Sequence, residues 1–179
     1  MTLLGDRLLA VHTALQEAGI PHAIGGAIAY AYCSEEPRGT RDVDVNLFVE
    51  PDRADEVFAA LPKAVRVTKA NREVVARDGQ VRLWWDETPV DLFFETHGFH
   101  REVAREIREV PFEGATIPVI GCEALIVFKA MFNRSRDWGD IEAMLDARSV
   151  DCRRVVERLR SLMGTADPVV VRLSTLCND

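Results

Sequence analysis

Positive charge is scarce in this sequence of 179 residues, and lysine is the scarcest basic residue. Lysine and arginine together number 22, against 29 aspartate and glutamate residues, which gives a formal net charge of −7. Only Lys63, Lys69 and Lys129 are lysines, and the other basic residues are arginines. A generally basic coat for nucleic acid is therefore excluded, and any polyanion must meet a local basic patch.

Cysteine pairs of the Cys-x-x-Cys type and long apolar runs near the N-terminus are also missing. Because the cysteines are far apart in a chain long enough to fold without crosslinks, we expect reduced thiols and an intracellular protein. Asp6 and Arg7 interrupt the first apolar residues before a signal peptide or a membrane span could form. We therefore expect a cytoplasmic protein that does not engage membranes. The cysteines concerned are Cys33, Cys122, Cys152 and Cys177.

The length and composition are those of one globular domain. Apolar residues make up 47% and charged residues 28% of the chain, which excludes a disordered, collagen-like or coiled-coil protein. Strand patterns mix with helix patterns in the first two-thirds of the sequence, and only helical patterns follow. We predict an α/β (mixed α+β) core over residues 1–120. Residues 121–179 are predicted to form a C-terminal helical bundle packed on the same domain.

Hydrophobic spacing and glycine or proline positions predict the individual elements. Leu4, Leu8, Val11 and Leu15, for example, recur at helical intervals, and Gly19 ends that helix. The pattern of residues 64–79 does not show where a helix or strand begins or ends. Helices are expected over residues 3–18, 51–61, 97–108, 123–132, 137–147 and 152–163, a strand–turn–helix unit over 21–33, a strand over 42–49, a hairpin from 81–85 with 89–95, and a strand pair over 110–120.

Three aspartates lie on the polar faces of predicted strands. Asp42 and Asp44 are two residues apart, so both carboxylates project from the same side of one strand. Asp91 projects from the second strand of the hairpin, opposite the apolar set Val90 and Leu92. Clustered carboxylates repel one another unless they bind cations, so the trio predicts a site for Mg²⁺ or Mn²⁺. The alternative is an ordinary solvent-facing side of a sheet.

Gly25 and Gly26 stand between a predicted strand and a predicted helix. Without side chains, their backbone N–H groups can approach an anion at the helix N-terminus, which suggests a phosphate cradle. A simple tight turn is the alternative.

These motifs together resemble the nucleotidyltransferase superfamily. The resemblance is carried by Gly25-Gly26, by Thr40-Arg-Asp-Val-Asp44 and by Val90-Asp91-Leu92, in that order. The segment 125–141, with Lys129, Arg134, Asp137 and Asp140, is similar to the signature of the bacterial branch related to AbiEii and MenT toxins. Three features depart from the pattern: Gly26 replaces the commoner serine, 15 residues separate it from Asp42, and Arg136 stands where lysine is frequent.

The resemblance implies a nucleotidyltransferase-like mixed sheet and transfer of a nucleoside monophosphate from an NTP to an acceptor hydroxyl, with release of pyrophosphate. Asp42, Asp44 and Asp91 are then the catalytic, metal-binding residues, and Asp91 can also help to deprotonate the acceptor. The resemblance also implies nucleotide-binding roles for Gly25, Gly26, Thr40, Arg41 and Lys129. It further implies secondary roles in the site for Arg134, Asp137 and Asp140.

Two of these assignments have plain structural alternatives. Lys129 is either a phosphate ligand or a surface lysine whose stem covers apolar residues. Asp137 and Asp140, three residues apart at a helix start, suit an N-cap and a first-turn acid, and Asp140 can also orient Lys129 or Arg134.

Three hypotheses remain for what the chain does. The resemblance after residue 122 favours a toxin that modifies tRNA and is paired with an antitoxin. The acidic net charge favours a protein or a small molecule such as an antibiotic as the acceptor. A catalytically inactive binding or regulatory module is the third hypothesis. Local arginine clusters over 66–82 and 153–160 could guide a phosphate backbone or could simply be solvated faces.

Overall fold

The computed structural model describes residues 3–178 and divides into two compact units. The first, called here the sheet unit, comprises the residues up to Gly26 together with Gly39–Ile120. The second, the helical unit, comprises Ala27–Arg38 and the chain from Gly121 onward. Residues 27–38, expected within the 1–120 core, thus group with the C-terminal helices.

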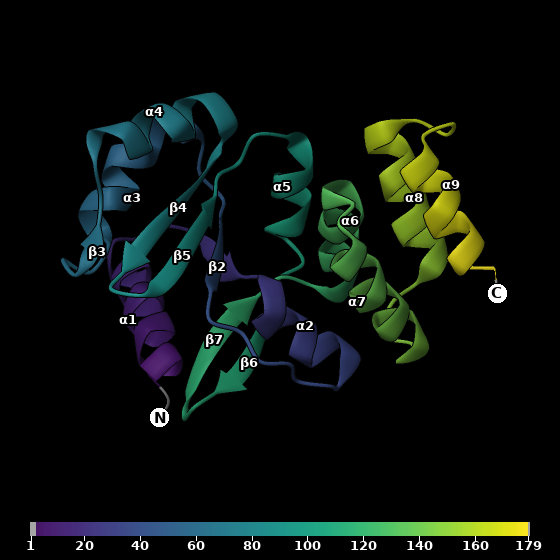
Figure 1. Ribbon diagram of the computed structural model, residues 1–179, viewed down its shortest axis with the longest axis horizontal. Coiled ribbons are helices and arrows are strands. Elements are labelled where there is room, and N and C mark those ends of the chain that lie inside the picture. Colours follow the sequence, from purple (N-terminus) through teal and green to yellow (C-terminus); the bar gives the residue numbers. More distant parts are fainter. Residues whose placement is uncertain (1–2, 179) are drawn as a thin grey trace. The chain divides into compact units, whose positions relative to one another are not determined.

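Within residues 3–178, seven strands form one mixed sheet in the order β3-β4-β5-β2-β1-β7-β6 (Figure 1). β2 is parallel to β5 and β1 is parallel to β7, whereas the remaining neighbours are antiparallel. The predicted mixed α/β fold is therefore confirmed. The strands are β1 (His22–Ile24), β2 (Val43–Leu47), β3 (Val65–Arg66), β4 (Gln80–Trp85), β5 (Thr88–Phe93), β6 (Arg108–Phe112) and β7 (Ala115–Val119).

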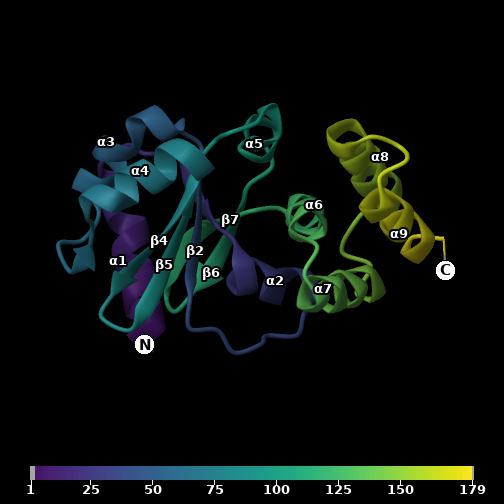
Figure 2. The same ribbon diagram turned by 45° about the horizontal axis from the view of Figure 1, so that its top comes forward.

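Helices of the sheet unit cover the apolar side of these strands. Leu8, Val11 and Leu15 are fully buried along one stripe of α1, which contacts β2 and β7. Figure 2 shows α1 alongside the strands of the sheet. Val43 and Leu92 are buried on the apolar side of their strands, as the alternating pattern predicts. The helices are α1 (Leu3–Glu17), the 3-10 turn η1 (Pro51–Arg53), α3 (Ala54–Ala60), α4 (Lys69–Asp78) and α5 (Gly98–Val103).

The helical unit is built from five helices in the part of the chain that the structure describes. α6 contacts α7, α8 and α9, and its Ile126, Val127 and Ala130 are fully buried. None of the helices in residues 3–178 is long and apolar enough to cross a bilayer. The helices are α2 (Gly26–Ser34), α6 (Cys122–Phe132), α7 (Ser135–Asp146), α8 (Cys152–Met163) and α9 (Pro168–Leu176).

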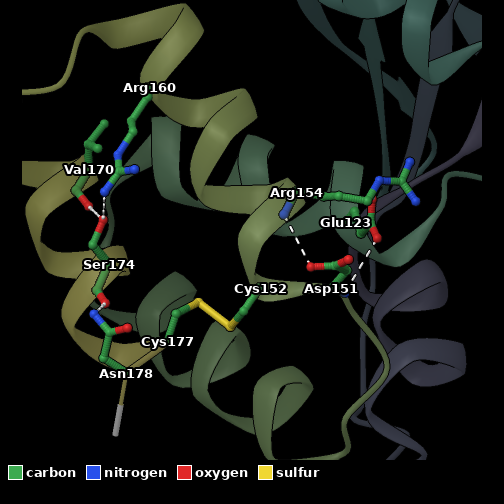
Figure 3. Close-up of a disulfide and its surroundings, with 9 residues drawn as sticks. All are labelled: Glu123, Asp151, Cys152, Arg154, Arg160, Val170, Ser174, Cys177 and Asn178. Carbon is green, nitrogen blue, oxygen red and sulfur yellow. Dashed lines mark hydrogen bonds and ion pairs between the residues drawn. A yellow bond between two sulfur atoms is a disulfide. The ribbon is translucent and has the colours of Figure 1, made fainter.

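The expectation of reduced thiols is wrong. Cys33 of α2 is bonded to Cys122 of α6. Cys152 of α8 is bonded to Cys177 after α9, and Figure 3 shows this second disulfide. The Cα–Cα distances are 5.5 Å and 5.7 Å, within the normal range for disulfides. Sequence spacing could not reveal these pairs because folding brings together residues 89 and 25 positions apart. The first disulfide joins α2 to α6 within the helical unit.

Hydrophobic spacing did not predict two of the helices, α4 and α9, although residues at their ends have capping signals. Thr68 caps α4 by accepting a hydrogen bond from the Asn71 backbone N–H, and Gly79 ends it with a φ of +65°. Asp167 caps α9, and Pro168 occupies its first turn. α4 is polar with little buried surface, so hydrophobic spacing is a poor guide there.

Candidate active site

The turn from β1 into α2 lies directly against Asp44. The Gly25 backbone N–H donates a 2.9 Å hydrogen bond to the Asp44 carbonyl oxygen. Gly26 has a φ of +53°, which disfavours residues with a side chain, and a β-carbon there would collide with Asp44 Oδ2. A β-carbon at Gly25 would likewise collide with the Asn46 amide. Both glycines therefore allow the backbone to approach the polar face of β2.

Two of the three predicted aspartates, Asp44 and Asp91, lie on β2 and β5, and the third directly precedes β2. These strands are parallel neighbours, and their register pairs Asp44 with Asp91. Parallel register points paired side chains to the same face, so these two carboxylates are adjacent. Asp42 lies one residue before β2, and its side chain is 33% exposed, compared with 13% for Asp91.

Arg82 of β4 joins two of these carboxylates, and sequence reasoning did not identify it. Its Nε donates to Asp91 Oδ1 at 2.7 Å, and its Nη2 donates to Asp91 Oδ2 at 2.6 Å. The same Nη2 donates to Asp42 Oδ2 at 3.2 Å, so Asp42 and Asp91 bind one guanidinium nitrogen. The hydrogen bond to Asp91 raises the pKa of Arg82 above its usual value, which keeps the guanidinium charged.

The register of the hairpin explains why Arg82 was missed. A loop of residues 86–88 would pair Trp85 with Pro89, but the structure pairs Trp85 with Thr88. This shift of one residue sets Arg82 directly across from Asp91. The correct turn length would have identified the ion pair from sequence.

Asp42, Asp44 and Asp91 have the chemistry to bind a hard divalent cation, because Mg²⁺ and Mn²⁺ prefer oxygen ligands. A cation, the Arg82 guanidinium, already bridges Asp91 and Asp42. As the side chains lie, no group of three or more His, Cys, Asp or Glu residues within 3–178 is arranged to hold a metal ion. The chemistry of the three carboxylates therefore suits such a cation, whereas their arrangement here does not hold one, and Arg82 engages two of the three.

Thr40 and Arg41 lie on the loop that leads into β2. The Asp42 backbone N–H donates to Thr40 Oγ1 at 3.2 Å, which orients the chain at the first aspartate. Arg41 is exposed.

Lys129 and the supporting residues lie in the helical unit, whereas the aspartate trio lies in the sheet unit. Lys129 is only 6% exposed, and its Nζ donates to Asp140 Oδ2 at 2.5 Å, with Asp137 Oδ1 at 3.7 Å. Arg38 also contacts Asp140, at 3.0 Å. Lys129 therefore belongs to a buried ion cluster, and the alternative of a surface lysine is wrong. The hydrogen bond from Lys129 to Asp140 agrees with the expectation that Asp140 orients Lys129.

The expected N-cap role of Asp137 needs correction, because α7 begins earlier, at Ser135. Asp137 occupies the third helical position and accepts hydrogen bonds from Arg134 Nε at 2.6 Å and Nη2 at 3.1 Å. Burial raises the pKa of Asp137, but the bonds to Arg134 and the charge of Lys129 outweigh burial, so this pKa lies below its ordinary value.

Most of the basic residues in the two predicted clusters have acidic partners. In the first cluster, Arg72 pairs with Asp55 and Arg77 with Asp78. Arg154 and Arg158 both pair with Glu123 in the helical unit. Such pairing favours the solvated-face interpretation over a nucleic-acid surface.

No family model matches the chain, and no curated protein does. Solved structures match its fold. The solution structure of the antibiotic-resistance factor ANT(2'')-Ia has a TM-score of 0.61 and 18% identity, covering 88% of this chain and 89% of that one. The crystal structure of ANT(2'')-Ia in complex with adenylyl-2''-tobramycin has a TM-score of 0.62 and 17% identity, with 90% and 97% covered.

The lincosamide antibiotic adenylyltransferase LnuA, in its lincomycin-bound crystal structure, matches with a TM-score of 0.55 and 13% identity. This match covers 79% of this chain and 96% of LnuA. At this level of identity the similarities concern the fold alone, and they do not single out the AbiEii and MenT branch. The chain has the fold of the nucleotidyltransferases.

Proposed function

We propose that this protein transfers a nucleoside monophosphate from an NTP to a hydroxyl group of a small molecule and releases pyrophosphate. The observation that carries the proposal is the set of carboxylates on adjacent strands. Asp44 and Asp91 are register neighbours, and Asp42 and Asp91 share one cationic partner. A sheet face that gathers three acids beside a bare glycine turn suits a reaction in which phosphates and cations meet.

Asp42, Asp44 and Asp91 would hold Mg²⁺ or Mn²⁺. When bound, such a cation neutralises phosphate charge and polarises the reacting phosphorus centre. Asp91 would also accept the proton of the acceptor hydroxyl. Gly25 and Gly26 form the proposed phosphate-binding turn, which lies against Asp44 at the start of α2.

Six further residues belong to the nucleotide-binding proposal, two in the sheet unit and four in the helical unit. Thr40 orients Asp42, and the exposed Arg41 can reach phosphate. Lys129 is the proposed phosphate ligand of the helical unit, and its Nζ bonds Asp140 Oδ2. Arg134, Asp137 and Asp140 would support it by holding the buried cluster together.

A small acceptor agrees with the charge of this chain and with its neighbours in fold. The net charge of −7 disfavours a polyanionic acceptor and suits a cationic or neutral hydroxylated compound. The ANT(2'')-Ia crystal structure contains adenylyl-2''-tobramycin, and the LnuA structure contains lincomycin. We therefore propose an antibiotic-like acceptor that carries hydroxyl groups.

A second candidate is the modification of a tRNA end, as part of a toxin with a cognate antitoxin. Only the resemblance of segment 125–141 to the AbiEii and MenT branch favours it.

A cytoplasmic location agrees with the need for NTP, whereas the two disulfides favour an oxidising compartment. We keep the cytoplasm as the proposed location because the substrate is there.

The test is incubation with Mg²⁺ and each labelled NTP, in separate reactions with aminoglycosides, lincosamides, tRNA and a protein extract. We expect label on a small molecule, together with pyrophosphate. Asp44→Asn should lower the rate by about 100-fold or more. Asp55→Asn, which removes an exposed carboxylate 75% accessible to solvent, should leave the rate unchanged.

Each other outcome selects a different function. Label on tRNA would establish the toxin hypothesis in place of ours, and label on protein would identify a protein acceptor. Absence of label and of pyrophosphate release, the same in Asp44→Asn as in the unaltered protein, would mean an inactive module.

A further inference from the structure

We propose that Arg82 is a resident counter-cation of the aspartate trio, which a divalent metal displaces and which then binds the triphosphate. The inference rests on the proposed function, since it adds a nucleotide-positioning residue to that site. The sequence analysis included Arg82 only in the basic cluster 66–82, and neither the nucleotidyltransferase motifs nor the fold comparison places it in the site.

Arg82 occupies the carboxylate oxygens that a metal needs. Its guanidinium bonds both oxygens of Asp91 and one oxygen of Asp42, with donor–acceptor distances of 2.6–3.2 Å. A divalent cation binding to the same oxygens must replace these bonds, and it would repel the guanidinium at close range. Arg82 and the metal therefore exclude one another from Asp91.

Release of Arg82 requires little rearrangement of the protein. Its side chain is 50% exposed, whereas that of its partner Asp91 is 13% exposed. The guanidinium thus approaches the carboxylate from the solvent side, and a rotamer change can withdraw it without opening the core. Leu83 and Val81, its neighbours on β4, point into the core and keep the strand in place.

After withdrawal from Asp91, the Arg82 guanidinium stays close to the aspartate trio. β4 is hydrogen-bonded to β5, so the Arg82 backbone remains in register with Asp91. A planar guanidinium binds two phosphate oxygens at once, and arginine keeps its charge at any physiological pH. Arg82 can therefore exchange a carboxylate for the triphosphate that arrives with the metal.

The exchange predicts opposite effects of one substitution on two ligands. In Arg82→Gln, the affinity for Mn²⁺ without nucleotide should rise roughly tenfold, because no cation competes for Asp91. The affinity for a non-hydrolysable ATP analogue at saturating Mn²⁺ should fall roughly tenfold, because a phosphate ligand is lost. Mn²⁺ binding is measured by electron paramagnetic resonance, and nucleotide binding by calorimetry.

Arg72→Gln is the matched control. Arg72 is also an arginine of the sheet unit, is 47% exposed and binds a carboxylate, Asp55, outside the trio. It tests the general effect of removing one positive charge, and we expect little change for either ligand. Arg82→Lys keeps the charge without the two-pronged geometry, so its Mn²⁺ affinity should lie between those of the unaltered protein and Arg82→Gln.

The outcomes separate this inference from the function on which it rests. Tighter Mn²⁺ binding with weaker nucleotide binding in Arg82→Gln supports the exchange. If the unaltered protein binds Mn²⁺ and transfers label while Arg82→Gln binds Mn²⁺ no better, Arg82 is a structural ion pair and the inference is wrong. If neither protein binds Mn²⁺, although thermal melting shows that both are folded, the metal-dependent function fails together with the inference.

Discussion

The carboxylate of Asp44 lies in the space that a β-carbon of Gly26 would occupy. The positive φ of Gly26, +53°, adds a second reason for glycine at this position. The Gly25-Gly26 turn, which is the candidate phosphate cradle, therefore lies in direct contact with Asp44. The serine that is commoner at this position in related motifs would not fit this backbone.

Substitution of Gly26 by alanine should therefore damage both folding and transfer. The β-carbon strains the backbone and displaces Asp44, at a cost of about 1–3 kcal/mol in the free energy of unfolding. Transfer should fall at least roughly tenfold, because the carboxylate loses its position. Urea denaturation and the labelled-NTP assay measure the two effects. Gly139→Ala, with open space around the added carbon, should retain full activity.

The buried ion cluster of the helical unit predicts a large loss of stability in Lys129→Met. Removing this cation leaves Asp137 and Asp140 buried with less compensation, which costs about 3 kcal/mol. The control Arg53→Gln breaks an exposed pair with Glu56 and should lower the free energy of unfolding much less. Equal unfolding free energies for the two variants would contradict the importance of the cluster.

The buried histidine pair of the sheet unit predicts a loss of stability in mild acid. His22 Nδ1 lies 2.7 Å from the Ile20 carbonyl oxygen, to which it must donate, so its Nε2 accepts from His12 Nδ1 at 2.9 Å. Burial lowers the pKa of both rings, against a smaller opposing effect of Glu109 on His12. Protonation would break this arrangement.

The direction of the pH effect follows from the lowered pKa values. As the pH falls below 6.5, these histidines bind protons in the unfolded chain but remain neutral in the folded protein, because their folded-state pKa values are lower. Proton binding therefore favours the unfolded state, and the free energy of unfolding decreases. The slope is at most about 1.4 kcal/mol per pH unit for each proton. Urea titrations at pH 5, 6 and 7 should show a smaller slope for His12→Gln than for the unaltered protein. Identical slopes would mean that the pair does not resist protonation.

The disulfides predict that denatured protein, without reductant, does not react with iodoacetamide. Mass spectrometry should show no added groups until a reductant is present. Replacing Cys33 and Cys122 together by alanine should lower the free energy of unfolding by about 3–5 kcal/mol, because this bond closes a long loop. The shorter loop between Cys152 and Cys177 should contribute somewhat less. Four alkylated cysteines in the absence of reductant would restore the expectation of reduced thiols.

Local sequence patterns were sufficient for much of the fold. The strict alternation around Asp44 and the apolar set around Asp91 placed both acids on the polar faces of strands, and the structure has those strands. The Gly25-Gly26 turn also needed no tertiary information, because strand, turn and helix follow directly in sequence. α4 was missed because it is stabilised by its caps more than by an apolar stripe.

The sequence by itself determined the elements and the chemical types of the candidate site, since both depend on neighbours within a few residues. The tertiary structure decided the pairings. It set Arg82 across from Asp91 by a register that differs by one residue, buried Lys129 between two carboxylates and joined cysteines far apart in the chain. Such contacts depend on the packing of whole elements, and no local pattern encodes the distance between two segments that meet only after folding.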